Sequence, residues 1–224
     1  MKKAQNVALS ITIAVAMLAL AGCSQSADSG VSPEVSAEQG AGSAGDAVTD
    51  QSSRSDQVWP VTQYELDSAL SSASSKEYDD FDEETTYLWA ATQFADSVIF
   101  GGQVDTAGGS AAFSAFVVYY SADDWIFFDT LVVRAGGQTY ELSTWESYEK
   151  GTDVGNGGIV TEYGVVSPGP SEDEAIAALL RDDSSKFRLS GSDGTVERAF
   201  TTEERQVIRN WFTAHRGLAE GLVP

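Results

Sequence analysis

The sequence predicts an α+β fold with an antiparallel β-sheet core, and three observations lead to this prediction. Residues 113–142 contain three consecutive strand-like segments joined by tight turns. Capped helical segments near 171–181 and 202–216 follow. A hairpin rather than a single strand is predicted between these helices, so strands and helices do not alternate in regular βαβ units.

The first predicted element is a short helix over residues 63–74. Thr62 and Glu65 have the spacing of a capping box, and apolar residues then recur on one helical face. Residues 77–84 are acidic and are expected to form a loop. Residues 86–100 have two interpretations, because their aromatic residues suit a pair of strands and their alanines suit a helix.

Three strands are predicted at the centre of the domain. Residues 113–120 are apolar on both alternating faces, as in a buried strand. Residues 125–134 are rich in aromatic and β-branched side chains, and residues 138–142 follow the pair Gly136-Gly137. Because their connections are short, we expect these strands to form one antiparallel meander.

The last third of the chain is predicted to mix strands and helices. Residues 159–166 form a strand after a glycine-rich loop over 151–158, and a capping-box sequence opens the helix at 171–181. Strands over 186–190 and 195–200 then form a hairpin through a Gly-Ser-Asp-Gly turn. The final helix, over residues 202–216, has acidic residues in its first turn.

The amino terminus has the layout of an export signal. Lys2 and Lys3 precede an apolar run from Val7 to Leu20, and the sequence Leu20-Ala21-Gly22-Cys23 follows. This resembles the signal of bacterial lipoproteins. The resemblance implies that residues 1–22 are removed and that Cys23 carries diacylglycerol and an N-acyl lipid. An ordinary secretory signal or an uncleaved membrane helix are the alternatives, but the 14-residue apolar run is short for a membrane span, which needs about 20 residues.

Composition divides the remaining chain into a tether and a domain. Residues 23–57 begin at the predicted lipidated cysteine and lack aromatic residues, so they are expected to be a disordered acidic tether. As a flexible coil it would span roughly 30–35 Å. The tryptophans begin at Trp59, and residues 58–224 are expected to form a single globular domain.

The chain is strongly acidic, with 13 basic and 34 acidic residues and a net charge of −21. Such a charge repels phosphate backbones, so nucleic acid is not expected as a partner. It favours cations or basic partners instead. The predicted partners are the membrane, through the lipid anchor, and an envelope protein or a glycan.

Several motifs of the globular part resemble a domain that recurs in uncharacterised bacterial and phage proteins, often lipoproteins. Most of the matching residues are aromatic or apolar, and the match spans about residues 77–216. The resemblance implies a fold and no chemistry. The motifs are Tyr78-Asp79-Asp80-Phe81, Tyr119-Tyr120, Asp124-Trp125-Ile126-Phe127-Phe128, Gly137-Gln138-Thr139-Tyr140-Glu141-Leu142 and Phe187-Arg188-Leu189.

Two residues are weak candidates for catalysis. Asp129 falls in a predicted strand, on the face shared by Trp125, Phe127 and two aliphatic residues. A buried carboxylate there would be a ligand group or an acid/base, whereas the alternative is a satisfied polar residue or one facing solvent. His215 is the only histidine. It is expected to cover Trp211 or to bond to the carbonyls that end its helix.

Two further features suggest binding. Trp145 and Tyr148, beside a glycine-rich loop, are candidates for an exposed stacking surface that binds a glycan or protein, although such residues are often core aromatics. Two acidic clusters are weak candidates for calcium ligands, but neither has the spacing of a calcium-binding loop. The clustered residues are Asp79, Asp80, Asp82, Asp123 and Asp124.

The sequence favours a non-catalytic, lipid-tethered binding or interaction module of the cell envelope. It contains no Gly-x-Ser-x-Gly, Walker or His-Glu-x-x-His motif, and no nucleophile–base pair can be named. The alternatives are a small carboxylate-dependent hydrolase and a calcium-binding surface protein. No cofactor is expected apart from the lipid on Cys23.

Overall fold

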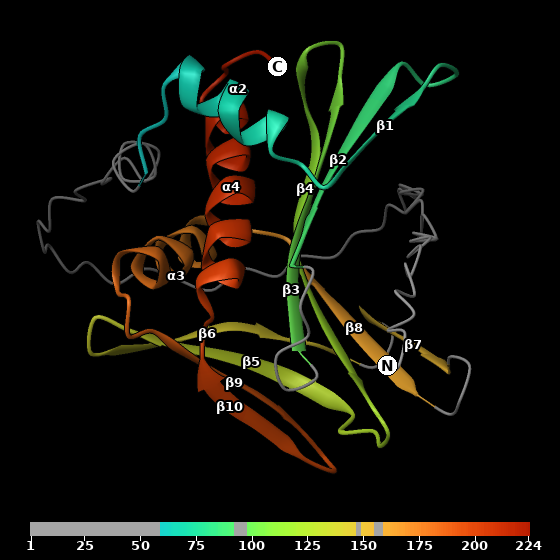
Figure 1. Cartoon of the computed structure of the whole chain (residues 1–224), viewed down its shortest axis with the longest axis vertical. Coiled ribbons are helices and arrows are strands. Elements are labelled where there is room, and N and C mark those ends of the chain that lie inside the picture. Colours follow the sequence, from blue (N-terminus) through green and yellow to red (C-terminus); the bar gives the residue numbers. More distant parts are fainter. Residues whose placement is uncertain (1–58, 92–97, 147–148, 155–158) are drawn as a thin grey trace, which may run out of the picture. The chain divides into compact units, whose positions relative to one another are not determined.

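The computed structural model describes residues 59–91, 98–146, 149–154 and 159–224, all within the compact unit Val48–Pro224. Cys23, the predicted signal and the predicted tether lie outside the described residues. The α+β prediction is confirmed, because two antiparallel sheets and three helices are present in the described part (Figure 1). The elements are α2 (Gln63–Ser71), β1 (Ser75–Asp79), β2 (Glu84–Ala90), β3 (Val98–Ala107), β4 (Ser110–Ala122), β5 (Phe128–Ala135), β6 (Gln138–Thr144), β7 (Lys150–Val154), β8 (Val160–Val166), α3 (Pro170–Arg181), β9 (Lys186–Gly191), β10 (Thr195–Ala199) and α4 (Thr202–Ala219).

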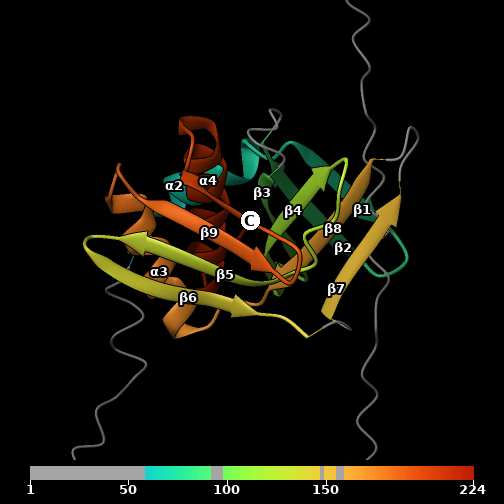
Figure 2. The same ribbon diagram turned by 90° about the horizontal axis from the view of Figure 1, so that it is seen from below.

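The strands divide between a six-stranded and a four-stranded sheet. The order of the larger sheet is β1-β2-β3-β4-β8-β7, and that of the smaller sheet is β10-β9-β5-β6. In Figure 2 the strands β9, β5 and β6 of the smaller sheet lie side by side. The predicted meander is therefore wrong, because β4 belongs to the larger sheet whereas β5 and β6 belong to the smaller one.

The capping box predicted from Thr62 and Glu65 is confirmed, whereas the one predicted from Ser171 is wrong. α3 begins one residue earlier, at Pro170 after Gly169, and the Glu172 carboxylate accepts the Gly169 N–H at 2.9 Å. The Thr62 hydroxyl accepts a hydrogen bond from the Glu65 N–H, and the Glu65 carboxylate accepts one from the Thr62 N–H at 2.8 Å. The same reciprocal pair joins Thr201 and Glu204 at the start of α4. Each pair satisfies two N–H groups that a helix start leaves without partners.

Two predicted loops contain edge strands. β1 lies partly within the predicted loop 77–84, and β7 lies partly within the predicted loop 151–158. Both strands are mostly exposed and lack an alternating apolar face, which is why the pattern did not reveal them. The ambiguous segment 86–100 belongs to β2 and β3 where it is described.

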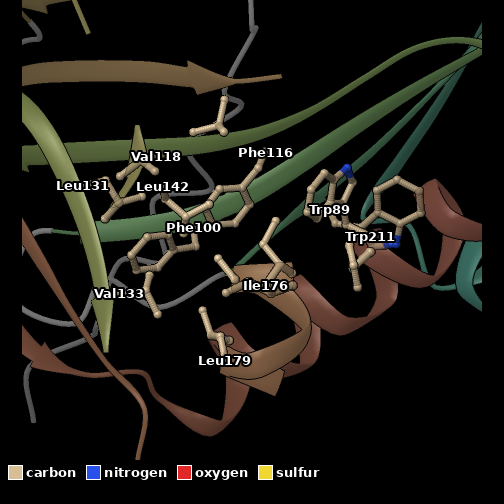
Figure 3. Close-up of a cluster of buried hydrophobic side chains, with 14 of the residues drawn as sticks. Trp89, Phe100, Phe116, Val118, Leu131, Val133, Leu142, Ile176, Leu179 and Trp211 are labelled. Atoms are coloured by element: carbon tan, nitrogen blue, oxygen red, sulfur yellow. The ribbon is translucent and has the colours of Figure 1, made fainter. Parts of the chain in front are cut away.

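The core lies where the helices cover the sheets. α4 packs on β2, β3 and β4, and α3 packs on β5 and β6. Figure 3 shows part of the resulting cluster, with Phe100 and Phe116 of the larger sheet, Leu131 of the smaller sheet, Ile176 of α3 and Trp211 of α4. One apolar core therefore joins both sheets.

Candidate functional site

A buried glutamate shapes the segment between β4 and β5. Only 2% of Glu162, on β8, is exposed. One carboxylate oxygen accepts the backbone N–H of Ile126 at 2.8 Å and that of Phe127 at 2.9 Å, and the other accepts the Phe128 N–H at 2.9 Å. Charge-assisted bonds of this kind are about twice as strong as neutral ones. Glu162 therefore fixes residues 126–128, at the entry to β5.

The same bonds explain why the predicted strand 125–134 begins late. Phe127 has a φ of +48°, which is the left-handed region and incompatible with an extended strand. For a bulky L-residue this conformation costs about 1–2 kcal/mol. Phe127 is nevertheless 44% exposed, so burial of its ring does not offset the strain.

Two rings stack on this segment. The rings of Trp125 and Phe127 have centroids 5.6 Å apart and planes 13° apart. We call Trp125 and Phe127 the aromatic pair. Between them, Ile126 is buried and contacts the β9–β10 hairpin, where its carbonyl accepts the Asp193 N–H at 3.2 Å. The Glu162 bonds and the hairpin contact together hold the aromatic pair on a supported loop.

Acidic side chains flank the aromatic pair. Asp123 and Asp124 precede it, Asp129 follows it, and Asp193 lies on the adjoining hairpin; all four residues are exposed. Burial and then the nearby carboxylates of Glu162 and Asp124 raise the pKa of Tyr120.

The predicted placement of Asp129 on a buried face is wrong. A β-bulge between Phe128 and Thr130 shifts the alternation, so that Phe128 and Leu131 point inward and Asp129 points to solvent. Its carboxylate accepts the Thr130 hydroxyl at 2.9 Å. This placement matches the solvent-facing alternative.

His215 bonds to a partner that the sequence did not identify. Its Nε2 atom lies 3.2 Å from one carboxylate oxygen of Asp173, and its ring stacks on Trp211 with centroids 5.7 Å apart. The Arg216 guanidinium donates to the other Asp173 oxygen at 2.9 Å. The stacking on Trp211 is as predicted. The cluster links the start of α3 to the end of α4, which gives His215 a structural role.

The predicted stacking surface is wrong at Trp145. This residue is 4% exposed, donates its indole N–H to the Val165 carbonyl at 2.8 Å, and meets the Phe128 ring edge to face. It is a core aromatic, in agreement with the alternative interpretation of its sequence position. Tyr148 lies outside the described residues.

The acidic clusters do not converge on a cation site. Among the described residues, no group of three histidine, cysteine or acidic side chains is placed to hold a metal. Asp79 instead accepts the N–H of Phe81 at 2.8 Å and that of Asp82 at 3.3 Å, which stabilises the turn between β1 and β2. Asp80, Asp123 and Asp124 are exposed.

A hollow of about 490 Å³ lies beside Trp59 and is lined in part by Arg181 and Arg209. The guanidinium carbons of these arginines lie 5.9 and 5.6 Å from the Trp59 ring centroid. Arg209 also donates to the Leu180 carbonyl at 3.2 Å. Both arginines thus place positive charge at the carboxyl end of α3, where such charge is favourable.

A second hollow, of about 390 Å³, is lined in part by Glu141, Glu149 and Glu172. Each carboxylate accepts a hydrogen bond within its own segment, from the Thr144 hydroxyl, the Glu146 N–H and the Gly169 N–H respectively. His215 lines neither hollow.

The aromatic pair is the site that sequence reasoning missed. The sequence pattern places Trp125 and Phe127 in a strand and does not distinguish Glu162. A signal for Glu162 was present, because it is a lone acid among Val160, Gly164 and Val166 on the inward face of β8.

Comparisons with protein-family models, curated proteins and solved structures each found no match to this chain. The resemblance to the domain of bacterial and phage lipoproteins therefore stays a prediction. Among the described residues, no helix has the length and apolar character needed to cross a membrane.

Proposed function

We propose that this protein is a lipid-anchored, non-catalytic interaction module of the bacterial cell envelope, and that the aromatic pair contacts its partner. The observation that carries the proposal is a stacked Trp125–Phe127 pair with an exposed, strained Phe127 on a loop fixed by a buried carboxylate.

The geometry resembles that of a preorganised contact surface. Aromatic side chains dominate the binding energy of many protein interfaces. A loop already held by Glu162 loses little conformational entropy when a partner binds. Residues with a strained backbone are also commoner at functional sites than elsewhere.

The predicted anchor and tether would hold this surface close to a membrane. Lipidation at Cys23 would supply two or more acyl chains, which hold a protein stably at a membrane. The predicted tether over residues 24–57 would let the domain reach a partner roughly 30–35 Å from the membrane.

In-cell crosslinking of the lipidated chain, followed by affinity purification and mass spectrometry, tests the proposal. Three chains are compared with the wild type: Phe127→Gly, Phe81→Gly and Cys23→Ala. Glycine suits the φ of +48° at position 127, so the first substitution removes the ring without straining the backbone. Phe81 is 91% exposed and is the matched control on another turn.

We expect a specific partner that is lost with Phe127→Gly and with Cys23→Ala but retained with Phe81→Gly. An unchanged crosslinking pattern with Phe127→Gly, at equal abundance of the protein, would reject the aromatic pair as the contact surface.

A further inference from the structure

We infer that the partner segment on the aromatic pair is cationic, namely a lysine- or arginine-containing stretch of an envelope protein. This inference rests on the proposed function and adds the chemistry of the partner. It starts from the exposed rings and uses the charges around them to decide which partner fits.

The rings favour a cation. The face of an aromatic ring is electron-rich, and it attracts a guanidinium or ammonium that lies over it. The stacked rings of Trp125 and Phe127 are nearly parallel, and Phe127 is the more exposed of the two. A flat guanidinium or a lysine stem can lie along the ring that faces solvent.

The flanking charges favour the same partner. Asp123, Asp124, Asp129 and Asp193 are exposed beside the aromatic pair. The neighbouring basic group, Lys150, donates its ammonium to the Phe128 carbonyl and lies 5.7 Å from the Phe128 ring centroid. The carboxylates thus outnumber the basic group, and this excess of negative charge would repel an anionic segment.

The charge of the whole chain adds to this local preference. A net charge of −21 attracts cationic segments over several ångströms and raises the rate of encounter. The aspartates beside the rings then fix where the segment binds, because ion pairs are strongest at contact.

The turn between β1 and β2 provides a competing acidic surface and hence a control. Phe81 is exposed there beside Asp80 and Asp82. Its ring stacks on no other ring among the described residues. A cationic segment attracted to negative charge in general would also bind at this turn. Binding at the aromatic pair would not involve this turn.

The test is binding of a fluorescent peptide to the lipidated full chain in neutral detergent micelles, measured by anisotropy. The probe contains five lysine or arginine residues separated by glycine and serine, and the comparison peptide has glutamine at those positions. We expect the cationic peptide to bind and its affinity to fall as salt is raised, and the glutamine peptide to bind at least tenfold more weakly, for about 1.4 kcal/mol.

Substitutions then locate the binding. Phe127→Gly should weaken binding about threefold, the loss expected of one exposed cation–π contact. Phe127→Asn, which also tolerates the left-handed conformation, should have the same effect. Asp123→Asn with Asp124→Asn should weaken binding about fivefold. The matched pair Asp80→Asn with Asp82→Asn removes the same charge elsewhere and should leave affinity within about twofold.

Equal binding of both peptides, or equal loss from the two aspartate pairs, would overturn the inference. If Phe127→Gly abolishes the crosslink in cells but the cationic peptide does not bind, the partner chemistry is wrong and the proposed function stands. If the peptide binds as expected but Phe127→Gly leaves the crosslinks in cells unchanged, the proposed function fails.

Discussion

At the scale of single residues, local sequence pattern misplaces one carboxylate and overlooks another. It predicts that Asp129 is buried, although Asp129 is exposed, and it does not distinguish Glu162, which is buried. Asp129 stands among apolar residues in the sequence, yet a β-bulge directs it to solvent. Glu162 is buried and accepts three backbone N–H groups. The bulge and these bonds arise from contacts with distant segments, so strand periodicity alone does not reveal them.

Glu162→Gln should lower the free energy of unfolding by about 2–3 kcal/mol. The amide has one acceptor oxygen where the carboxylate has two, and its NH₂ group would face backbone donors. Chemical denaturation of the full chain measures the loss.

The matched control for Glu162 is Glu141→Gln. The Glu141 residue is exposed and accepts one hydroxyl hydrogen bond. Its substitution should change stability by less than about 0.5 kcal/mol. Equal effects of the two substitutions would contradict the structural role assigned to Glu162.

At the scale of elements, α3 and α4 are joined at both ends by buried polar side chains. Asp173 near the start of α3 contacts His215 and Arg216 near the end of α4. At the opposite ends, the Arg205 guanidinium donates to the carbonyls of Leu179 at 2.9 Å and Leu180 at 3.2 Å. These carbonyls belong to the last turn of α3, which a helix leaves without partners.

Arg205→Lys should destabilise the protein by about 2–4 kcal/mol, because one ammonium does not replace a planar guanidinium that makes five hydrogen bonds. Arg188→Lys is the control, since Arg188 pairs with Glu197 at the surface. The control should change stability by less than about 1 kcal/mol. Urea denaturation distinguishes the two, and a similar small effect at both positions would refute the capping role.

Asp182 connects the end of α3 with the turn between β5 and β6. The Ser184 hydroxyl, the Gly136 N–H and the Ser184 N–H all donate to its carboxylate and lower its pKa. A lowered pKa means that the carboxylate stabilises the fold above its unfolded value of about 3.9. This contribution disappears as the pH falls through the lowered folded value.

Asp182→Asn should therefore melt at a lower temperature than the wild type at pH 7, and the difference should shrink as the pH approaches 3. Thermal melts across this range measure it. Asp80→Asn, at an exposed position, is the control. A difference that grows in acid would contradict the assigned direction.

Local sequence predicts the capped helices and the β9–β10 hairpin, because each signal lies within a few residues. β1 and β7 were missed because exposed edge strands carry no buried face to create a pattern. The aromatic pair was missed for another reason. Its irregular backbone depends on Glu162, which is distant in sequence.

At the scale of the molecule, the division into two sheets was beyond local pattern. β4 pairs with β8, and residues 123–159 lie between them in the chain. Those residues include β5 and β6, which join the other sheet. Short connections favour a meander, but β4 pairs instead with β8, which is distant in the chain.

The predicted anchor gives an expectation for the whole protein. Cys23→Ala should move the protein from the membrane fraction to the soluble fraction, because the lipid is the expected membrane attachment. Cell fractionation with immunoblotting measures the change. Retention of Cys23→Ala in the membrane fraction, after a salt wash, would argue against lipidation as the means of attachment.

The pairing of β4 with β8 also governs the order in which this chain can mature. During synthesis β4 emerges well before β8, and its edge stays open while residues 123–159 are made. An open strand edge beside apolar side chains such as Phe116 and Val118 is a template for aggregation. The nascent chain thus passes through a vulnerable interval, and a chaperone that shields β4 during that interval would raise the yield of folded protein.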